Sequence, residues 1–216
     1  MLGTIRKRAS SVAPATRKRT RMSTQARRAQ LLRCAVEACA EVGISRVGHV
    51  DVADRAQVAV PTVFAYFPTR QVLVRAIMKD VRRFYMDLMK SVPREGNAKD
   101  VTFALFWECT RRARSDPHYI RVWLDWSTSI RHETWQRYLK LWNDGIAIFK
   151  AVLDKGKRDG DLDASLDTLT AAQILLGGAH TIGVMLFSGA PDKQLESLVR
   201  HLVNGVLHSE SSVRKR

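Results

Sequence analysis

The sequence has few cysteines and none of the motifs that identify common enzyme classes. Its three cysteines, Cys34, Cys39 and Cys109, form no CxxC pair, and Cys34 and Cys39 would point about 140° apart on a helix. We expect them to be small core residues in a reducing compartment, not metal ligands or disulfide partners. The six histidines show no HExxH or similar spacing, and GxSxG, P-loop and GxGxxG motifs are missing. These absences predict a protein without catalytic residues, metal site or cofactor.

Segments typical of membrane and secreted proteins are also missing from the sequence. We find no secretory signal segment and expect no apolar run long enough to span a bilayer. The Arg- and Ser-rich N-terminus is compatible with an organelle transit peptide, but residues 1–22 carry no amphipathic apolar stripe. The sequence therefore predicts a soluble, cytoplasmic protein with no membrane partner.

Acidic residues are absent from residues 1–33, which contain ten arginines and lysines. The whole chain of 216 residues has 36 basic and 21 acidic residues, a net charge of +15. Such a charge predicts attraction to polyanions. The basic run is either a solvated tail or an arm that contacts DNA. We prefer the arm, because the segment that follows is typical of DNA binding, and we expect double-stranded DNA as the partner and a nucleoid-associated location.

Every long segment has a helical period, and no clear β alternation is present. The pattern predicts an all-α fold with helices over residues 23–43, 50–57, 61–67, 70–91, 98–115, 117–130, 132–159, 164–188 and 192–209. We divide the chain into a disordered basic arm (1–22), a three-helix DNA-binding domain (23–70), a larger helical ligand-binding and dimerisation domain (71–210), and a tail (211–216).

The segment Val50 to Leu73 contains two short apolar-periodic stretches, a tight break, an aromatic pair and a proline stop. This order is typical of a helix-turn-helix, whose second helix enters the major groove of DNA. Val63 and Phe67 should face the first helix of the domain. Phe64 and Tyr66 are either core aromatics or DNA contacts. We expect the DNA-facing positions to be Val60, Pro61, Thr62, Phe64, Ala65 and Tyr66.

The candidate recognition positions include no Arg, Asn or Gln, so the bidentate contacts to guanine and adenine are missing. Recognition should depend on apolar contacts to thymine methyls and on DNA shape. Thr62 and Tyr66 carry hydroxyls that can bind phosphate. Arg19 and Arg21 of the arm are candidates for insertion into a narrow, A/T-rich minor groove.

The last two predicted helices carry the candidate dimer contacts. The first is rich in small residues and the second has a wide apolar stripe. They either pair within a monomer or form a four-helix interface with a second copy. We prefer the homodimer, because helix-turn-helix proteins usually read two half-sites. The candidate interface residues are Ile174, Gly178, Leu195, Leu198 and Leu202.

The stretch TVFAYFPTR, residues 62–70, resembles the DNA-binding domain of the TetR family. Further pieces are RKRTR (17–21), Gly48-His49, AQV (56–58) and VWLDWSTS (122–129). With these, about residues 17–208 are similar to the LuxR/HapR-type quorum-sensing master regulators of vibrios. The resemblance implies an all-helical homodimer of about nine helices per chain that represses and activates many promoters at palindromic operators. It also implies that the arm, with Arg17, Arg19 and Arg21, enters the minor groove, and that His49 is structural or close to DNA. We include His49 and Arg70 among the DNA-binding candidates.

The chain departs from the pattern of this subgroup at two positions. Ala65 stands where the subgroup has Asn, which removes a hydrogen-bonding group from the base edges and puts an identical operator preference in doubt. Ala59 stands where the subgroup has Ser, which removes a helix cap worth ~1 kcal/mol. Pro61 partly offsets that loss by preorganising the first turn.

Five tryptophans, Trp107, Trp123, Trp126, Trp135 and Trp142, fall within 36 residues. They form either a packed aromatic core or the wall of a cavity for a small apolar ligand. The TetR resemblance implies a pocket here, which the bulky Trp142 could itself fill. The candidate lining residues are Tyr85, Leu88, Met89, Trp123, Trp142 and Asn143.

Three functional hypotheses follow. The first is a sequence-specific homodimeric transcriptional regulator, a repressor, an activator or both, of the quorum-sensing master type. The second is a ligand-responsive TetR-like repressor of a neighbouring efflux or catabolic operon. The third is a nucleoid-type protein that binds DNA without sequence preference through its basic arm.

Overall fold

The computed structural model describes residues 22–131 and 133–208, which form nine α-helices and no strand. The predicted helices are all present, and their bounds differ most at the start of α8, which was predicted at residue 164 and lies at Thr168. The helices are α1 (Thr24–Val42), α2 (His49–Ala56), α3 (Val60–Tyr66), α4 (Arg70–Ser91), α5 (Ala98–Ser115), α6 (Pro117–Thr128), α7 (Trp135–Asp159), α8 (Thr168–Phe187) and α9 (Asp192–Val206).

Local sequence signals define both ends of α1. The hydroxyl of Ser23 accepts a hydrogen bond from the N–H of Ala26 at 3.1 Å, which satisfies one of the free N–H groups of the first turn. Gly43 ends the helix with φ of 86°, a conformation that glycine adopts without strain. These ends agree with the helix predicted over residues 23–43.

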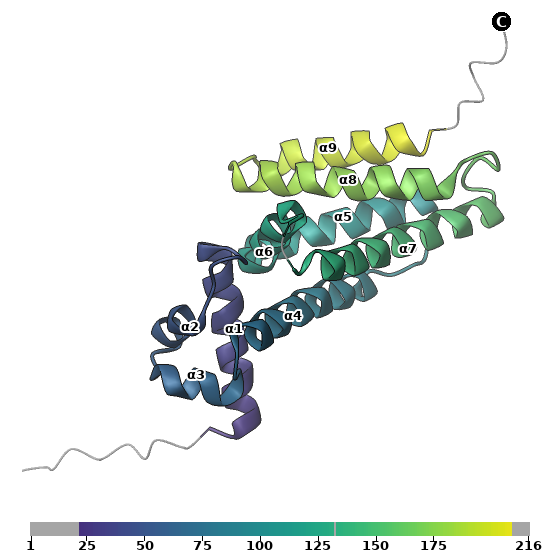
Figure 1. Ribbon diagram of the computed structural model, residues 1–216. Helices are drawn as coiled ribbons and strands as arrows, with labels where there is room; N and C mark the ends of the chain where they lie inside the picture. Colours follow the sequence, from purple (N-terminus) through teal and green to yellow (C-terminus); the bar gives the residue numbers. More distant parts are fainter. Residues whose placement is uncertain (1–21, 132, 209–216) are drawn as a thin grey trace, which may run out of the picture.

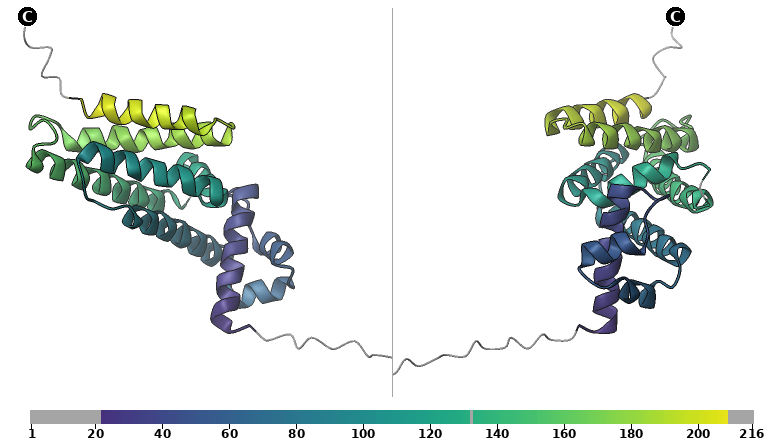
Figure 2. Two further views of the ribbon diagram at one scale, coloured as in Figure 1. Left: turned by 180° about the vertical axis from the view of Figure 1, so that it is seen from behind. Right: turned by 60° about the vertical axis from the view of Figure 1, so that its left-hand side comes forward.

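Helices α1, α2 and α3 form a small unit from which α4 leads into the rest of the chain (Figure 1). The core of this unit includes the wholly buried Leu31, Val52, Val63 and Phe67. Helix α1 packs against α2, α4 and α6, and it stands across the long axes of the helices of the larger part (Figures 1 and 2). The position of α2 and α3 relative to the rest of the molecule therefore depends on what holds α1.

The larger part of the molecule is a stack of helices (Figure 2). Helices α5 and α7 lie between α4 on one side and the α8–α9 pair on the other, and α6 fills the space beside α1 (Figure 1). Its core contains Leu105, Phe149, Leu153, Leu175 and Trp126, all nearly or fully inaccessible to solvent. Trp126 also donates a hydrogen bond from its ring N–H to the carbonyl of Thr134 at 3.2 Å.

The three cysteines are free thiols, and Cys34 and Cys39 are buried, as expected. Burial raises the pKa of both Cys39 and Cys109 to about 12. Both therefore stay protonated at neutral pH, the less reactive form of a cysteine.

Helix α8 is unusually apolar for a helix at the surface. Contrary to the sequence expectation, it is long and apolar enough, by length and composition, to cross a membrane, the one such helix among the described residues. Only 33% of its apolar window is buried, and Ile174 and Val184 are 51% and 57% exposed. An exposed apolar face of this kind needs a covering partner.

Gly156 marks a close contact between the end of α7 and the start of α5. A Cβ atom at this position would lie 2.4 Å from the Cβ of Ala98, which is fixed to the backbone and cannot move aside. We expect Gly156→Ala to lower the free energy of unfolding by about 1–3 kcal/mol through overpacking. Gly205→Ala, where no atom lies within 4 Å, should leave it unchanged or raise it by up to about 1 kcal/mol. Urea unfolding followed by circular dichroism measures both, and equal midpoints for the two variants would contradict the close contact.

Candidate nucleic-acid interface

A tight left-handed turn joins α2 to α3. Gln57 ends α2 with φ of 53° and ψ of 50°, and the N–H of the next residue, Val58, donates to the carbonyl of Ala53 at 3.0 Å. At the other end of α2, the N–H of Gly48 donates to the carboxylate of Asp51 at 2.8 Å. Together these contacts fix the short α2 and aim α3 away from the body of the protein. This is the arrangement of a helix-turn-helix.

The solvent-facing side of α3 carries the residues that were predicted to meet DNA. Pro61, Phe64 and Ala65 are exposed, whereas Val63 is fully buried against the rest of the unit. Phe64 is 46% exposed, so it is not a core aromatic. The other three predicted positions, Val60, Thr62 and Tyr66, are half-buried.

Val50 belongs to the same surface but was not among the predicted residues. It is the second residue of α2 and is 57% exposed, the largest exposed fraction of an apolar side chain in the three-helix unit. The sequence offered a signal for this residue: Val52, Ala53 and Ala56 form the inward-facing apolar stripe of α2, and Val50 lies outside that stripe. An exposed apolar residue at the start of α2 extends the surface formed by α3.

His49 lies beneath this surface rather than on it. Its imidazole is 8% exposed, and it stacks on the ring of Phe64 with centroids 3.8 Å apart and planes 8° from parallel. Its Nε2 lies 2.6 Å from the carbonyl oxygen of Phe67, and since a carbonyl can only accept, Nε2 carries the proton. The structural interpretation of His49 therefore describes it better than direct DNA contact, because the ring positions the exposed Phe64.

Arg70 is also held by the protein itself. Its Nε donates to the carbonyl of Val47 at 2.9 Å and its Nη2 donates to the carbonyl of Ile44 at 2.8 Å. The side chain is half-buried beside the loop between α1 and α2. These contacts show that Arg70 stabilises the loop with two of its donors, and its inclusion among the DNA-binding residues stays a prediction.

The start of α3 lacks a side-chain cap. Ala59 is the N-cap residue and offers no side-chain acceptor, while Pro61 lies in the first turn. The absence of the cap agrees with the substitution noted in the sequence. The arm residues Arg17, Arg19 and Arg21 lie outside the described residues.

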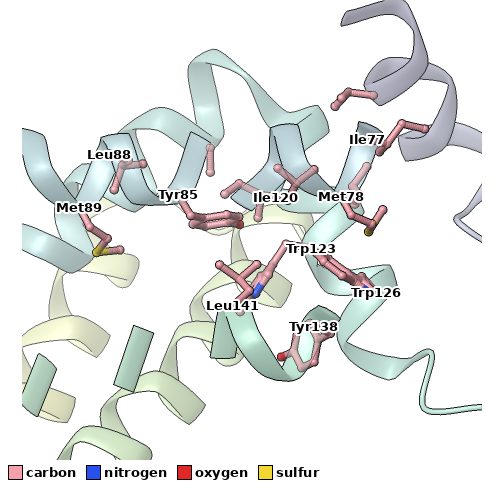
Figure 3. Close-up of a cluster of buried hydrophobic side chains, with 14 of the residues drawn as sticks. Ile77, Met78, Tyr85, Leu88, Met89, Ile120, Trp123, Trp126, Tyr138 and Leu141 are labelled. Carbon is pink, nitrogen blue, oxygen red and sulfur yellow. The ribbon is translucent and has the colours of Figure 1, made fainter. Parts of the chain in front are cut away.

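A small cavity lies in the larger part of the molecule, between α4, α5, α6, α7 and α8. Its lining includes four of the six predicted residues, namely Tyr85, Met89, Trp123 and Trp142. Leu88 is buried elsewhere in the core, and Asn143 is exposed and does not reach the cavity, so both predictions were wrong. Figure 3 shows Tyr85, Ile120, Trp123 and Leu141 directed toward one another across this region.

The cavity is apolar and small. Its volume is about 80 Å³, and no charged side chain lines it. The hydroxyl of Tyr85 is buried without a hydrogen-bond partner among the described residues, and burial raises its pKa well above the usual value. A buried polar group without a partner costs stability, so its presence in this wall is unusual.

The predicted dimer residues divide into two groups. Ile174 is exposed on α8, and Leu198 and Leu202 are half-buried on α9. Leu195 is fully buried inside its own chain, so it cannot meet a partner. Gly178 packs against the Leu202 side chain of the same chain, where an added Cβ would lie 2.2 Å from a methyl group.

The exposed side of α8 contains residues that the prediction missed. Val184 is 57% exposed, and Gly177 and Thr181 are exposed on the same face of the helix as Ile174. Residues three and four apart share one face of a helix, so these four positions form a single stripe. Sequence alone did not separate this stripe from the inward one, because both are apolar.

In the described parts of the chain, no group of three His, Cys, Asp or Glu side chains is placed to hold a metal ion.

Comparisons with known proteins point to one family. A family model described as "Bacterial regulatory proteins, tetR family" matches residues 31–77. The HTH-type transcriptional regulator LuxR of Vibrio harveyi is 31% identical over 186 residues, which are 86% of this chain and 91% of that protein. The second match spans the three-helix unit and the larger part together.

Solved structures share the fold. The transcriptional regulator FadR of Bacillus subtilis, in complex with stearoyl-CoA, superposes with a TM-score of 0.69 at 19% identity, over 83% of this chain and 97% of that one. A TetR family regulator, the CifR cysteine mutant complexed with 26-bp double-strand operator DNA, has a TM-score of 0.64 at 18% identity, over 81% and 94% of the two chains.

The contact of His49 with Phe67 should stabilise the three-helix unit. His49→Phe keeps a flat ring under Phe64 but removes the N–H that the carbonyl of Phe67 accepts. We expect the free energy of unfolding to fall by about 1–3 kcal/mol, the cost of a buried acceptor left without its donor. Val50→Ala, at the exposed neighbouring position, should change it by less than about 0.5 kcal/mol. Denaturant unfolding measures both, and a His49→Phe protein as stable as the wild type would show that the hydrogen bond does not support the fold.

Proposed function

The chain belongs to the TetR family of bacterial regulatory proteins, and from this premise we propose that it is a regulator of the quorum-sensing master type. Members of this family are DNA-binding transcriptional regulators that act as dimers, and this chain is one of them rather than an enzyme. As a bacterial DNA-binding regulator it works in the cytoplasm. Nucleoid association, and both repression and activation at many promoters, are part of the proposal.

One observation supports the quorum-sensing assignment above the others. The 31% identity to LuxR runs through 186 residues, far beyond the 47 positions from 31 to 77 that the broad family model covers. A DNA-binding unit alone would share only the shorter stretch. Similarity that extends through the regulatory helices is what a shared regulatory role would preserve.

The surface of α3 supports recognition by shape and apolar contact. Its exposed residues are Pro61, Phe64 and Ala65, which carry no hydrogen-bonding side-chain atom for a base edge. Apolar side chains favour thymine methyl groups in the major groove. The basic arm, including Arg17, Arg19 and Arg21, supplies charge for the backbone and for narrow A/T-rich minor grooves. We propose a palindromic operator with A/T-rich flanks.

The exposed stripe on α8 is the proposed dimer surface. Ile174, Gly177, Thr181 and Val184 face solvent, and Leu198 and Leu202 of α9 lie half-buried beside them. A second copy that covers the stripe would remove the exposed apolar area of α8 from water. The same contact would set two copies of α3 on one face of DNA.

The regulator proposal is tested by selecting bound duplexes from a random library at low and at high salt. We expect an inverted-repeat motif with A/T-rich flanks that persists at high salt, because specific contacts do not depend on counterion release alone. Val184→Lys places a charge in the dimer stripe and should reduce affinity for the full motif by at least about 100-fold.

The matched control is Ile130→Lys, which adds the same charge at a side chain 64% exposed beyond the end of α6, outside both the α3 surface and the α8 stripe, and should keep palindrome binding within about tenfold. Enrichment without any motif, lost as the salt concentration rises, would instead identify a non-specific binder that relies on its arm.

A second function, ligand-responsive regulation, is favoured by the cavity beneath α4. A cavity of about 150 Å³ holds benzene, so the present volume of about 80 Å³ admits a ligand only if side chains such as Trp142 move. The absence of charged groups from the wall favours an uncharged ligand, because an unpaired charge is costly to bury. The unpaired hydroxyl of Tyr85 would offer that ligand one hydrogen bond.

Tyr85→Phe tests this second function, with three probes of similar size: methylcyclohexane, cyclohexanone and cyclohexanecarboxylate. Wild-type protein should bind the ketone and reject the acid, as measured by tryptophan fluorescence and thermal shift. Tyr85→Phe should weaken ketone binding by about tenfold, the value of one hydrogen bond, and leave hydrocarbon binding unchanged.

The free energy of unfolding of ligand-free Tyr85→Phe should be equal to or above that of the wild type, because the lost hydroxyl has no partner. Binding of the acid as tight as that of the ketone, or ketone binding that the variant does not change, would refute the ligand assignment.

A further inference from the structure

The loop between α1 and α2 is held from two sides at a single residue. The N–H of Ile44 donates to the Oδ2 of Asp125 on α6 at 2.8 Å. The carbonyl of Ile44 accepts a hydrogen bond from Arg70, the first residue of α4, also at 2.8 Å. The Ile44 side chain is 1% exposed. Both backbone polar groups of one buried residue are therefore occupied by side chains from α4 and α6, two of the three helices that α1 packs against.

Asp125 connects the three-helix unit to the helices that follow α4. Within residues 22–131 and 133–208, its contact with Ile44 is the one hydrogen bond that joins residues 23–69 to helices α5–α9. In the same described ranges, the other side-chain hydrogen bonds and ion pairs of the three-helix unit stay within it or reach only α4. The contact also lies where α1 ends, since Gly43 is the C-cap of that helix.

The carboxylate of Asp125 lies directly beside the end of α1. A Cβ at Gly43, whose φ is 86°, would lie 3.6 Å from that carboxylate, an ordinary van der Waals distance. Burial raises the pKa of Cys39 to about 12, with a further upward effect from Asp125 and an opposing one from Arg70. The exposed Asp125 and the half-buried Arg70 thus both lie close to the end of α1.

Buried apolar side chains pack beside this hydrogen bond. Trp126, next to Asp125, is 1% exposed, and Ile77 and Met78 of α4 are 0% and 2% exposed. Figure 3 shows these three side chains in the same cluster as Tyr85 and Trp123 of the cavity. Asp125 itself is exposed on α6 whereas Ile44 is buried, so breaking the hydrogen bond leaves the N–H of a buried residue without its side-chain partner. The three-helix unit therefore cannot tilt about this point freely.

We infer that Asp125 is a specificity-determining residue that selects the spacing of operator half-sites without touching DNA. The inference rests on the proposed function in one respect, namely that one operator carries two half-sites. In a dimer the two recognition helices must lie about 34–36 Å apart, and one base pair more or less shifts a half-site by about 3.4 Å and rotates it by about 35°. The angle at which α1 leaves the larger part decides whether both copies of α3 reach their grooves, and Asp125 fixes that angle.

The test uses the full-length dimer and the operator obtained by selection, in three forms with zero, one added or one removed central base pair. We expect wild-type affinity to fall at least about tenfold for either altered spacing. D125A should reduce this loss to about threefold or less, because the freed joint lets α1 adapt. D125N keeps an acceptor oxygen at the same place and should retain the wild-type spacing preference.

The matched control is D144A, which removes the ion pair between Asp144 of α7 and Arg82 of α4, at 2.7 Å, without affecting the loop. It should keep the wild-type spacing preference even if it lowers the melting temperature. If D125A does not fold, as judged by circular dichroism, D125S takes its place, because its hydroxyl is too short to reach Ile44.

Two results would overturn the inference. In the first, the Asp125 variants weaken all three operators by the same factor, which would mean that the contact only stabilises the fold. In the second, D125N loses the spacing preference together with D125A, which would mean that the acceptor at Ile44 is not the cause. A wild-type protein that shows no spacing preference would count against the proposed two-half-site function itself, so the two failures are distinguishable.

Discussion

The structure depends on one helix that belongs to two cores. The first turns of α4 bury Leu73 and Ile77 beside α1, and its later turns bury Tyr85 and Leu88 against the larger part. Because the same apolar face is shared, neither core can rearrange without moving α4. The cavity and the helix-turn-helix thus lie at two ends of one rigid rod of 22 residues, about 33 Å long at 1.5 Å per residue. This is the physical basis on which a pocket and a DNA surface can influence one another.

Much of the fold could be predicted, because the spacing of apolar residues along the sequence indicates which segments form helices. The inward position of Val63 and the outward position of Phe64 follow from the period of α3 alone. The sequence did not resolve the role of side chains whose hydrogen-bond partner lies far away along the chain. His49 bonds a residue 18 positions ahead and Arg70 one 26 positions behind, and no periodicity encodes such pairs. For Leu195 the apolar pattern was correct, but a pattern does not say whether its partner is the same chain or a second copy.

The recognition surface combines little polarity with an abundance of charge nearby. Pro61, Phe64 and Ala65 offer shape and methyl contacts, whereas the positive charge is concentrated in the first 33 residues. Affinity and selectivity would then come from different parts of the chain, the first from phosphate neutralisation and the second from fit. In such a division the rigid presentation of α3 matters more than any single base contact. The stacked His49 beneath Phe64 is part of that rigidity.

The apolar stripe of α8 would make the stability of the folded protein depend on its own concentration. A single chain leaves Ile174 and Val184 in contact with water, and pairing through the proposed dimer stripe would remove that cost, so the folded state would gain stability as the concentration of chains rises. Newly made chains that have not met a partner are then the ones most open to proteolysis. Degradation would fall more heavily on the protein when it is scarce than when it is plentiful. The level of functional regulator would consequently rise more steeply than its rate of synthesis, a threshold that arises from the exposure of one helix face.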